Sequence, residues 1–179
     1  MFRLIRQDLK QFAHGPNLRD KIKVIILTPG FAAVFLFRVE AFLYRKHLLM
    51  LSYLFYRLNL NLHGIDILPG CEIGPGLRIE HPVGIVIGAN STIGSNCTIM
   101  HGVTLGVKNV NRNTNTQECP QIGNDVFIGA NSTILGKIAV GDNSVIGAHS
   151  LVLVDCPANS RFTGSSLSLP QSARQDFDE

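Results

Sequence analysis

Two histidines and an aspartate are the residues of this chain best suited to acid–base chemistry. His81 and His101 each stand two residues after an isoleucine, and Asp66 lies upstream of both in the run Gly64-Ile65-Asp66-Ile67. A histidine backed by a carboxylate can act as a general base, because the carboxylate fixes the tautomer and stabilises the imidazolium that forms. The spacing is equally compatible with hydrated surface histidines, so these residues alone leave both interpretations open.

Cysteines are the other candidate ligands. Cys71, Cys97, Cys119 and Cys156 are too far apart in the sequence to form a close ligand pair or a disulfide framework. His81 and His101, with Cys119 nearby, would make a zinc site of imidazole and thiolate ligands. Because no third ligand falls on the same repeat position, we expect no metal.

A six-residue repeat must position these side chains. Such a period fits neither an amphipathic helix nor a simple alternating strand, but it fits a parallel β-helix in which three units complete one turn. We therefore expect a mainly β fold whose unit heads point into a narrow core. These heads are Ile67, Ile73, Ile79, Ile87, Ile93, Ile99, Leu105, Ile122, Ile128, Ile134, Val140, Ile146 and Val152.

The repeat makes further predictions about single positions. The fifth residue of each unit is small or aliphatic, as at Cys71, Val83, Cys97 and Cys156, and should pack inside. Gly or Asn at the corners should supply backbone angles that other residues resist, and most heads are followed by Gly. His81 and His101 are one turn apart, so they should stack on one edge at about the 4.8 Å spacing of neighbouring strands, with Asp66 near the same corner.

Two interruptions break the six-residue count. The first is an eight-residue unit at 79–86 that contains His81, and the second is a loop excursion at about 106–121 that contains Cys119. Loops that leave a rigid scaffold are free to carry function, because the core does not dictate their residues.

The first sixty residues have helical patterns instead. Apolar residues at three- and four-residue steps predict a helix from Phe2 to Phe12. A second helix should begin near Leu18 and be broken or kinked at Pro29-Gly30. A third helix should run from about Phe31 to Tyr56, with a charged interruption at 45–47. We interpret these helices as a cap that packs on itself and on a partner subunit, or as an interfacial membrane anchor rich in basic and aromatic residues.

Composition and charge limit the classes of protein to which the chain can belong. The 179 residues are 45% hydrophobic and 16% charged with a net charge of +3, which excludes disorder for most of the chain and does not suggest nucleic acid. Residues 1–62 carry ten Lys/Arg and three Asp/Glu. We expect a helical region at 1–62, a β-helix at 63–164 and a flexible tail at 165–179. No signal peptide is recognisable, so we expect a cytoplasmic protein, with the inner face of the membrane as a second option.

The motifs of the β-helix resemble those of serine acetyltransferases. The matching runs are Gly64-Ile65-Asp66-Ile67-Leu68-Pro69-Gly70, Ile73-Gly74-Pro75-Gly76, Glu80-His81, Gly84-Ile85-Val86-Ile87-Gly88 and Gly102-Val103-Thr104-Leu105-Gly106. Those enzymes are left-handed β-helix members of the hexapeptide acyltransferase superfamily. The resemblance implies acetyl-CoA as co-substrate, His81 as the general base with Asp66 as its partner, and homotrimers or dimers of trimers with sites between subunits.

The resemblance also implies where acetyl-CoA would bind. A backbone N–H near Gly106 would hold the oxyanion of the tetrahedral intermediate. Small residues at Ala130, Gly147 and Ala148 would line the groove for CoA. Lys108, Lys137 and Arg161 would meet its phosphates, or would be ordinary surface charges.

Departures from the family pattern concern the acceptor. Where the family has an Arg-His pair before a proline, this chain has Glu118-Cys119 before Pro120, and the family's aspartate before the catalytic histidine is Glu80. We expect Glu80, His101, Glu118 and Cys119 to line the acceptor site. An acidic residue in place of the arginine would repel the carboxylate of free serine.

These departures predict an acceptor hydroxyl on a sugar. We expect the acceptor to be a precursor of a capsular polysaccharide or exopolysaccharide, and peripheral membrane contact would suit a membrane-bound glycan. The alternatives are a serine O-acetyltransferase of cysteine biosynthesis and a non-catalytic β-helix scaffold.

Overall fold

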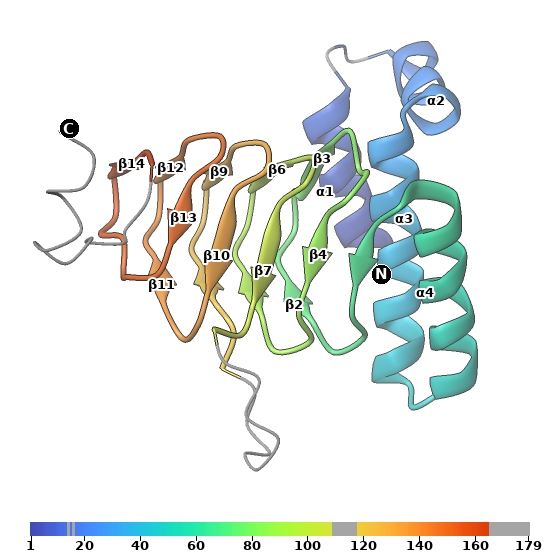
Figure 1. Ribbon diagram of the computed structural model, residues 1–179. Helices are drawn as coiled ribbons and strands as arrows, with labels where there is room; N and C mark the ends of the chain where they lie inside the picture. Colours follow the sequence, from blue (N-terminus) through green and yellow to red (C-terminus); the bar gives the residue numbers. More distant parts are fainter. Residues whose placement is uncertain (14, 16, 109–117, 165–179) are drawn as a thin grey trace, which may run out of the picture.

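A parallel β-solenoid forms most of the computed structural model, which describes residues 1–13, 15, 17–108 and 118–164 (Figure 1). Its strands form three sheets that run along the solenoid as three faces. Face A consists of β1, β4, β7, β10 and β13, face B of β2, β5, β8 and β11, and face C of β3, β6, β9, β12 and β14. The predicted tail at 165–179 and part of the predicted excursion, 109–117, lie outside the described residues.

The strands are short, as one face of a narrow prism requires. Their bounds are β1 Asp66–Ile67, β2 Glu72–Ile73, β3 Arg78–Glu80, β4 Val86–Ile87, β5 Thr92–Ile93, β6 Thr98–Met100, β7 Thr104–Gly106, β8 Gln121–Ile122, β9 Phe127–Ile128, β10 Thr133–Leu135, β11 Ala139–Val140, β12 Val145–Ile146, β13 Leu151–Val152 and β14 Arg161–Phe162.

The register of the strands confirms the six-residue repeat. On face A, Ile67 pairs with Ile87, Ile87 with Leu105, and Leu105 with Ile134, so that equivalent unit heads lie directly above one another. Every predicted head is buried except Ile73, which is half-buried against the same core. Cys71, Cys97 and Cys156 are buried packing residues, as predicted.

One prediction about a single position of the repeat is wrong, and the glycines after the heads have a role of their own. Val83 is 69% exposed, and Ile85 occupies the inward position instead, because the eight-residue unit shifts the count by two residues. The glycines after the heads do not have left-handed backbones. They keep the coils close, since a Cβ on Gly94 would lie 2.5 Å from the carbonyl oxygen of Gly123.

Other glycines and several asparagines supply the left-handed corners. Positive φ angles occur at Gly70, Gly76, Asn96 and Asn131, among others, which confirms the prediction that Gly or Asn occupies such corners.

A helical head of four helices closes the amino-terminal end of the solenoid. It consists of α1 Phe2–Phe12, α2 Leu18–Leu27, α3 Pro29–Arg45 and α4 Leu49–His63. The predicted third helix is in fact two helices: His47 adopts a φ of 57° between them, and the second runs to His63. Pro29 begins α3, where its missing N–H costs no helical hydrogen bond.

A buried ion pair joins the head to the solenoid. The guanidinium of Arg38 donates to both carboxylate oxygens of Asp8, at 2.8 and 3.0 Å, and to the carbonyl oxygens of Ile73 and Gly74. Asp8 also accepts hydrogen bonds from the backbone N–H groups of Gly76 and Leu77. Both charges are therefore fully partnered, and they fix the position of α1 and α3 on the first coil.

Candidate active site

A column of residues runs along the edge where the chain passes from face C to face A. His81 follows β3 and His101 follows β6, and their rings contact edge to face with centroids 6.2 Å apart. This arrangement confirms that the two histidines stack on one edge. His81 is exposed, with a φ of 55°, so its imidazole is accessible to a substrate.

Small residues continue this C–A edge beyond the histidines. The backbone N–H of Asn131 donates to the carbonyl oxygen of His101, and the backbone N–H of His149 donates to the carbonyl oxygen of Ala130. A Cβ on the neighbouring Gly129 would lie 2.5 Å from the nitrogen of Ala148. The residues predicted to line a CoA groove, Ala130, Gly147 and Ala148, therefore lie on the same edge as His81.

Asp66 begins β1, beside the strand that follows the His81 corner. Its backbone N–H donates to the carbonyl oxygen of Ile85. Its Oδ1 accepts a hydrogen bond of 2.9 Å from the hydroxyl of Tyr56 in α4. Within the described residues no hydrogen bond joins Asp66 to His81. Burial, followed by the contact with Asp66, raises the pKa of Tyr56 to about 12, so the hydroxyl stays protonated and donates.

Glu40 is a second carboxyl group behind Asp66. It is buried in α3, and neither of its carboxylate oxygens has a hydrogen-bond partner within the described residues. Burial and then the charge of Asp66 raise its pKa to about 8, so Glu40 is mostly neutral at pH 7. Sequence analysis missed both Tyr56 and Glu40, because only the packing of α3 and α4 on the first coil brings them to Asp66.

Glu80 and His101 do not have equivalent surroundings. The carboxylate of Glu80 forms an ion pair with Arg78, whose guanidinium also donates to the carbonyl oxygen of Gln11. The Nδ1 atom of His101 is buried and has no hydrogen-bond partner in the part of the chain that is described. Glu80 thus has a partner already, whereas His101 retains an unused ring nitrogen.

A second group of predicted residues lies on the edge between faces A and B. Gly106 ends β7, and Lys108 follows it, with its Cβ 3.4 Å from where a Cβ on Gly136 would be. Glu118 and Lys137 form an exposed ion pair at 4.0 Å, which contributes little to stability. Arg161 lies on face C, in β14 at the carboxyl-terminal end of the solenoid.

Cys119 packs inside this A–B edge. It is 5% exposed, and its Sγ lies 3.0 Å from where a Cβ on Gly88 would be. The thiol of Cys71 donates to the carbonyl oxygen of the same glycine. In the described part of the chain Cys119 therefore packs beside Cys71, and its predicted place in the acceptor site stays a prediction. Among the residues that can be described, no group of three His, Cys, Asp or Glu side chains could hold a metal ion.

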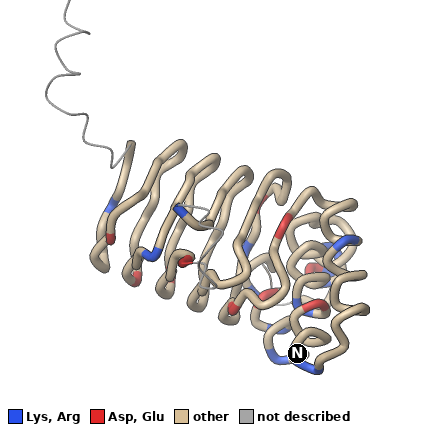
Figure 2. The backbone as a smooth tube through the Cα atoms, turned by 60° about the horizontal axis from the view of Figure 1, so that its bottom comes forward, with Lys and Arg blue, Asp and Glu red and all other residues tan. Residues whose placement is uncertain are grey.

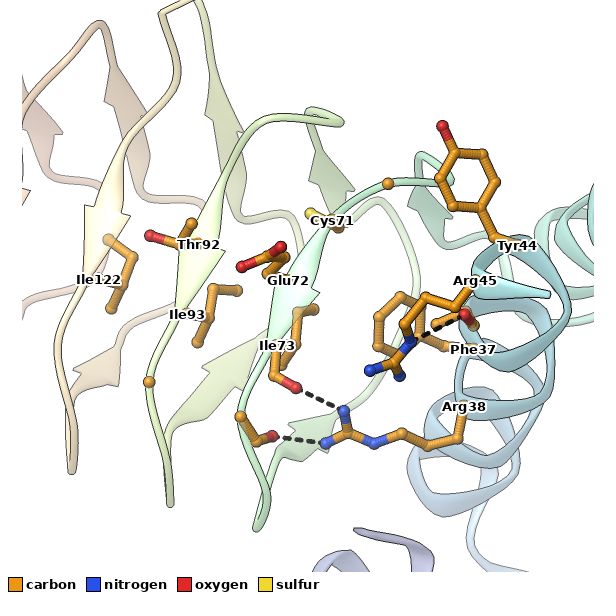
Figure 3. Close-up of a pocket in the computed structure, with 14 residues that line it drawn as sticks. Phe37, Arg38, Tyr44, Arg45, Cys71, Glu72, Ile73, Thr92, Ile93 and Ile122 are labelled. Carbon is orange, nitrogen blue, oxygen red and sulfur yellow. Dashed lines mark hydrogen bonds between the residues drawn. The ribbon is translucent and has the colours of Figure 1, made fainter. Parts of the chain in front are cut away.

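A further pocket lies away from the C–A edge. It has a volume of about 570 Å³ and lies between face B and α3, where Arg38, Tyr44, Arg45 and Glu72 surround it (Figure 3). Arg38 in its wall is already bound to the first coil, and Arg45 donates to the carbonyl oxygen of Ala41. This pocket lies at the interface between the helical head and the solenoid.

The two edges border face A on opposite sides, so one chain does not bring the two groups of residues together. His81, His101, Ala130, Gly147 and Ala148 share the C–A edge, whereas Gly106, Lys108, Glu118, Cys119 and Lys137 share the A–B edge. A site that uses both groups requires a second copy of the chain.

Comparisons with known proteins identify relatives of the whole chain. Family models described as "Bacterial transferase hexapeptide (six repeats)" and "Hexapeptide repeat of succinyl-transferase" match residues 119–153 and 84–110. A serine acetyltransferase of Helicobacter pylori is 39% identical over 150 residues, which are 84% of this chain and 86% of the relative. One of Synechococcus elongatus is 35% identical and covers 92% of this chain, but the chain spans only 66% of that relative.

Solved structures give the same result. The soybean serine acetyltransferase apoenzyme matches with a TM-score of 0.83 and 32% identity, covering 94% of this chain and 68% of the soybean chain. The Neisseria gonorrhoeae serine acetyltransferase in complex with serine matches with a TM-score of 0.78 and 32% identity, covering 94% of this chain and 67% of that chain.

Proposed function

The chain belongs to the serine acetyltransferase family of hexapeptide-repeat transferases, and from this premise we propose that it is an O-acetyltransferase that uses acetyl-CoA. The observation that carries the proposal is the C–A edge, where an accessible histidine and a row of small residues lie on one line. His81 is the general base of this reaction, and Ala130, Gly147 and Ala148 line the groove for CoA.

The proposed reaction needs a single base. The imidazole of His81 removes the proton of the acceptor hydroxyl while its oxygen attacks the thioester carbonyl carbon, and a backbone N–H near Gly106 stabilises the resulting oxyanion. The carbon–sulfur bond then breaks, and the leaving CoA thiolate takes the proton back from the imidazolium. Acetyl ester and free CoA thiol are the products, and no metal takes part.

Asp66 supports the imidazolium in this proposal. Tyr56 occupies only Oδ1 of the carboxylate, which leaves the other oxygen to turn towards His81 when substrate is bound. Catalytic hydrogen bonds are often long or absent without substrate and form in the reacting complex. Tyr56 is then a positioning residue that holds the carboxylate behind the base.

The complete site is formed by two subunits of a homotrimer, alone or paired with a second trimer. One subunit contributes the C–A edge with His81, and its neighbour contributes the A–B edge with Gly106, Lys108 and Lys137. The separation of these two edges on one chain supports this assembly. In this proposal Arg161, at the end of face C, binds a phosphate of CoA that extends along the groove.

Serine is the acceptor that the relatives favour. Both the sequence matches and the solved structures are serine acetyltransferases, and one of those structures is a complex with serine. We therefore propose serine as the first candidate, ahead of the sugar that the sequence departures predict.

A sugar hydroxyl is the second candidate, because charges that would hold free serine are absent from the expected positions. Glu118 stands where the family has a positive side chain, and Glu80 is paired with Arg78. Neither residue offers a positive charge to the carboxylate of an amino acid.

An acceptor screen separates these candidates. The full chain is incubated with acetyl-CoA and either serine, nucleotide sugars or oligosaccharide fragments, and the released thiol is followed, with alanine as the matched control that lacks a hydroxyl. Thiol release with serine but not alanine supports the first candidate, and release with a sugar alone supports the second. Failure to bind acetyl-CoA or to release thiol with any acceptor would leave only the scaffold.

A further inference from the structure

Helix α4 exposes most of its apolar side chains to solvent, and the two residues that it buries are both polar. Ser52 and Asn59 are buried and donate to the carbonyl oxygens of Glu40 and Ala33 in α3, at 3.1 and 3.0 Å. On the outer side, Met50 is 91% exposed, Leu54 62% and Leu62 64%. A soluble helix normally has the opposite arrangement, so the outer side of α4 is built to meet an apolar environment.

The exposed apolar surface extends from α4 to α2. A hollow of about 420 Å³ near the end of α4 is lined by residues of all four helices, including Ile25, Phe35 and Leu62. A second hollow lies at the start of α4, against Met50 and Leu54. We call this surface the leucine face and define it by six exposed residues: Ile26, Leu27, Met50, Leu54, Leu58 and Leu62.

Basic side chains outnumber acidic ones on the surface of the head. Of the ten Lys/Arg and three Asp/Glu in residues 1–62, Arg38, Asp8 and Glu40 are buried, which leaves nine cations and Asp20 on the surface of the head. Arg57 lines the same hollow as Met50 and Leu54, and Lys46 lies in the turn before α4. Figure 2 shows the Lys and Arg positions gathered on the helices near the amino terminus.

A second copy of the chain fits this surface poorly. If two heads met face to face, two surfaces with the same excess of positive charge would oppose one another. The described part of the solenoid has only four exposed large hydrophobic residues, Val83, Val86, Phe127 and Val154, and only the first two lie close to one another in the sequence. It therefore offers no apolar surface of matching size for a head-to-tail contact.

We propose that the helical head binds the surface of an anionic phospholipid bilayer through the leucine face. The leucines enter the acyl boundary, and the lysines and arginines of the head meet the lipid phosphates. Among the described helices none is by itself long and apolar enough to cross a membrane, and the one pair that passes this test together, α2 and α3, is bent by 82°. Most of α3 is buried within the protein, so the head lies on the bilayer and does not span it. This proposal does not depend on the acetyl transfer reaction.

Vesicle flotation with the full chain tests the proposal. We expect the protein to float with vesicles of phosphatidylcholine and phosphatidylglycerol at low salt, and to be released at high salt because the charges are screened. Leu54→Glu should weaken binding by about tenfold or more, because it removes apolar burial and adds a negative charge. Val154→Glu is the matched control, since Val154 is equally an exposed apolar residue but lies on the solenoid, and it should bind like the unmodified chain.

Three outcomes would overturn the proposal. They are no flotation with anionic vesicles, equal binding to vesicles of phosphatidylcholine alone, and an unchanged affinity of Leu54→Glu. If the protein does not float with anionic vesicles, and Leu54→Glu instead lowers the mass of the assembly in light scattering, a second copy covers the leucine face. Thermal melts of both variants establish that they fold.

Discussion

The solenoid and the helical head differ in the side chains that they bury and expose. In the solenoid the core consists of stacked aliphatic residues such as Ile79, Ile99 and Ile128, which are completely buried. The head buries apolar side chains too, but it also buries charged and polar ones (Asp8, Arg38, Glu40, Ser52 and Asn59), while leucines of α4 are exposed. The packing of the solenoid is therefore directed inwards, whereas the head leaves an apolar surface open to solvent.

This difference separates the tasks of the two regions. A regular stack of coils holds His81, His101 and the small residues of the C–A edge on a fixed line, which suits a site that must bind an extended co-substrate. The head fixes the first coil through Asp8 and Arg38, supplies Tyr56 to Asp66, and presents a surface to a partner outside the chain.

Breaking the ion pair between the two regions should have the largest effect on stability. Asp8→Ala leaves the guanidinium of Arg38 buried without its charge partner and leaves two backbone N–H groups without an acceptor. We expect the free energy of unfolding to fall by about 3–5 kcal/mol. Urea denaturation measures it, and a loss below 1 kcal/mol would mean that the head is held by other contacts.

Truncating one aliphatic residue in each region tests the comparison directly. Ile99→Ala should cost about 2–5 kcal/mol, because it leaves a cavity between coils. Leu54→Ala in the exposed face of α4 should change the stability of the free protein by less than about 0.5 kcal/mol. Equal losses in urea denaturation would show that Leu54 is covered in solution.

Glu40 should make the stability of the head depend on pH. Its pKa is about 8 in the folded protein and 4.5 ordinarily, so between these values the folded state holds a proton that the unfolded chain releases. Stability should therefore fall as pH rises from 4.5 to 8, by up to about 1.4 kcal/mol per pH unit, and level off above pH 8. Glu40→Gln should remove this slope in denaturation series at pH 5, 6.5 and 8, and parallel slopes for both proteins would contradict it.

Removing the hydroxyl of Tyr56 should have the smallest effect. Tyr56→Phe deletes the hydrogen bond to Asp66 and should cost about 1 kcal/mol of stability. Because Asp66 supports the imidazolium, kcat should fall by up to about tenfold, while KM for acetyl-CoA stays the same. Steady-state kinetics with varied acetyl-CoA separates the two constants. An effect on KM alone would assign Tyr56 to binding.

The solenoid and its C–A edge could be predicted from the sequence, because every coil must fill the same narrow core. Counting the eight-residue unit and then two six-residue units places Ile99 above Ile79 and His101 above His81. The prediction failed where the count changes, at Val83, and it did not include the role of the glycines after the heads, which permit the close approach of two coils, as at Gly94. The repeat carries no information on the distance between coils at a given corner, and the hand of the coil rests on the resemblance alone.

The joint between head and solenoid could not be predicted. Asp8 and Arg38, and likewise Tyr56 and Asp66, meet because of the angles at which helices pack on the first coil, and no periodic pattern encodes those angles. The segment up to Tyr56 could be recognised as helical and apolar, but the sequence did not indicate that Ser52 and Asn59 would face inwards. The burial of Cys119 could not be predicted, because the excursion before it interrupts the repeat.

The most direct test of the account is the kcat of His81→Ala with the acceptor identified in the screen. His47→Ala is the matched control, because His47 is also exposed and has nearly the same left-handed backbone, with φ of 57° against 55°. We predict that His81→Ala lowers kcat on the order of 10²- to 10⁴-fold with an unchanged melting temperature, while His47→Ala keeps full activity. Full activity of His81→Ala would contradict the assignment of His81 as the base.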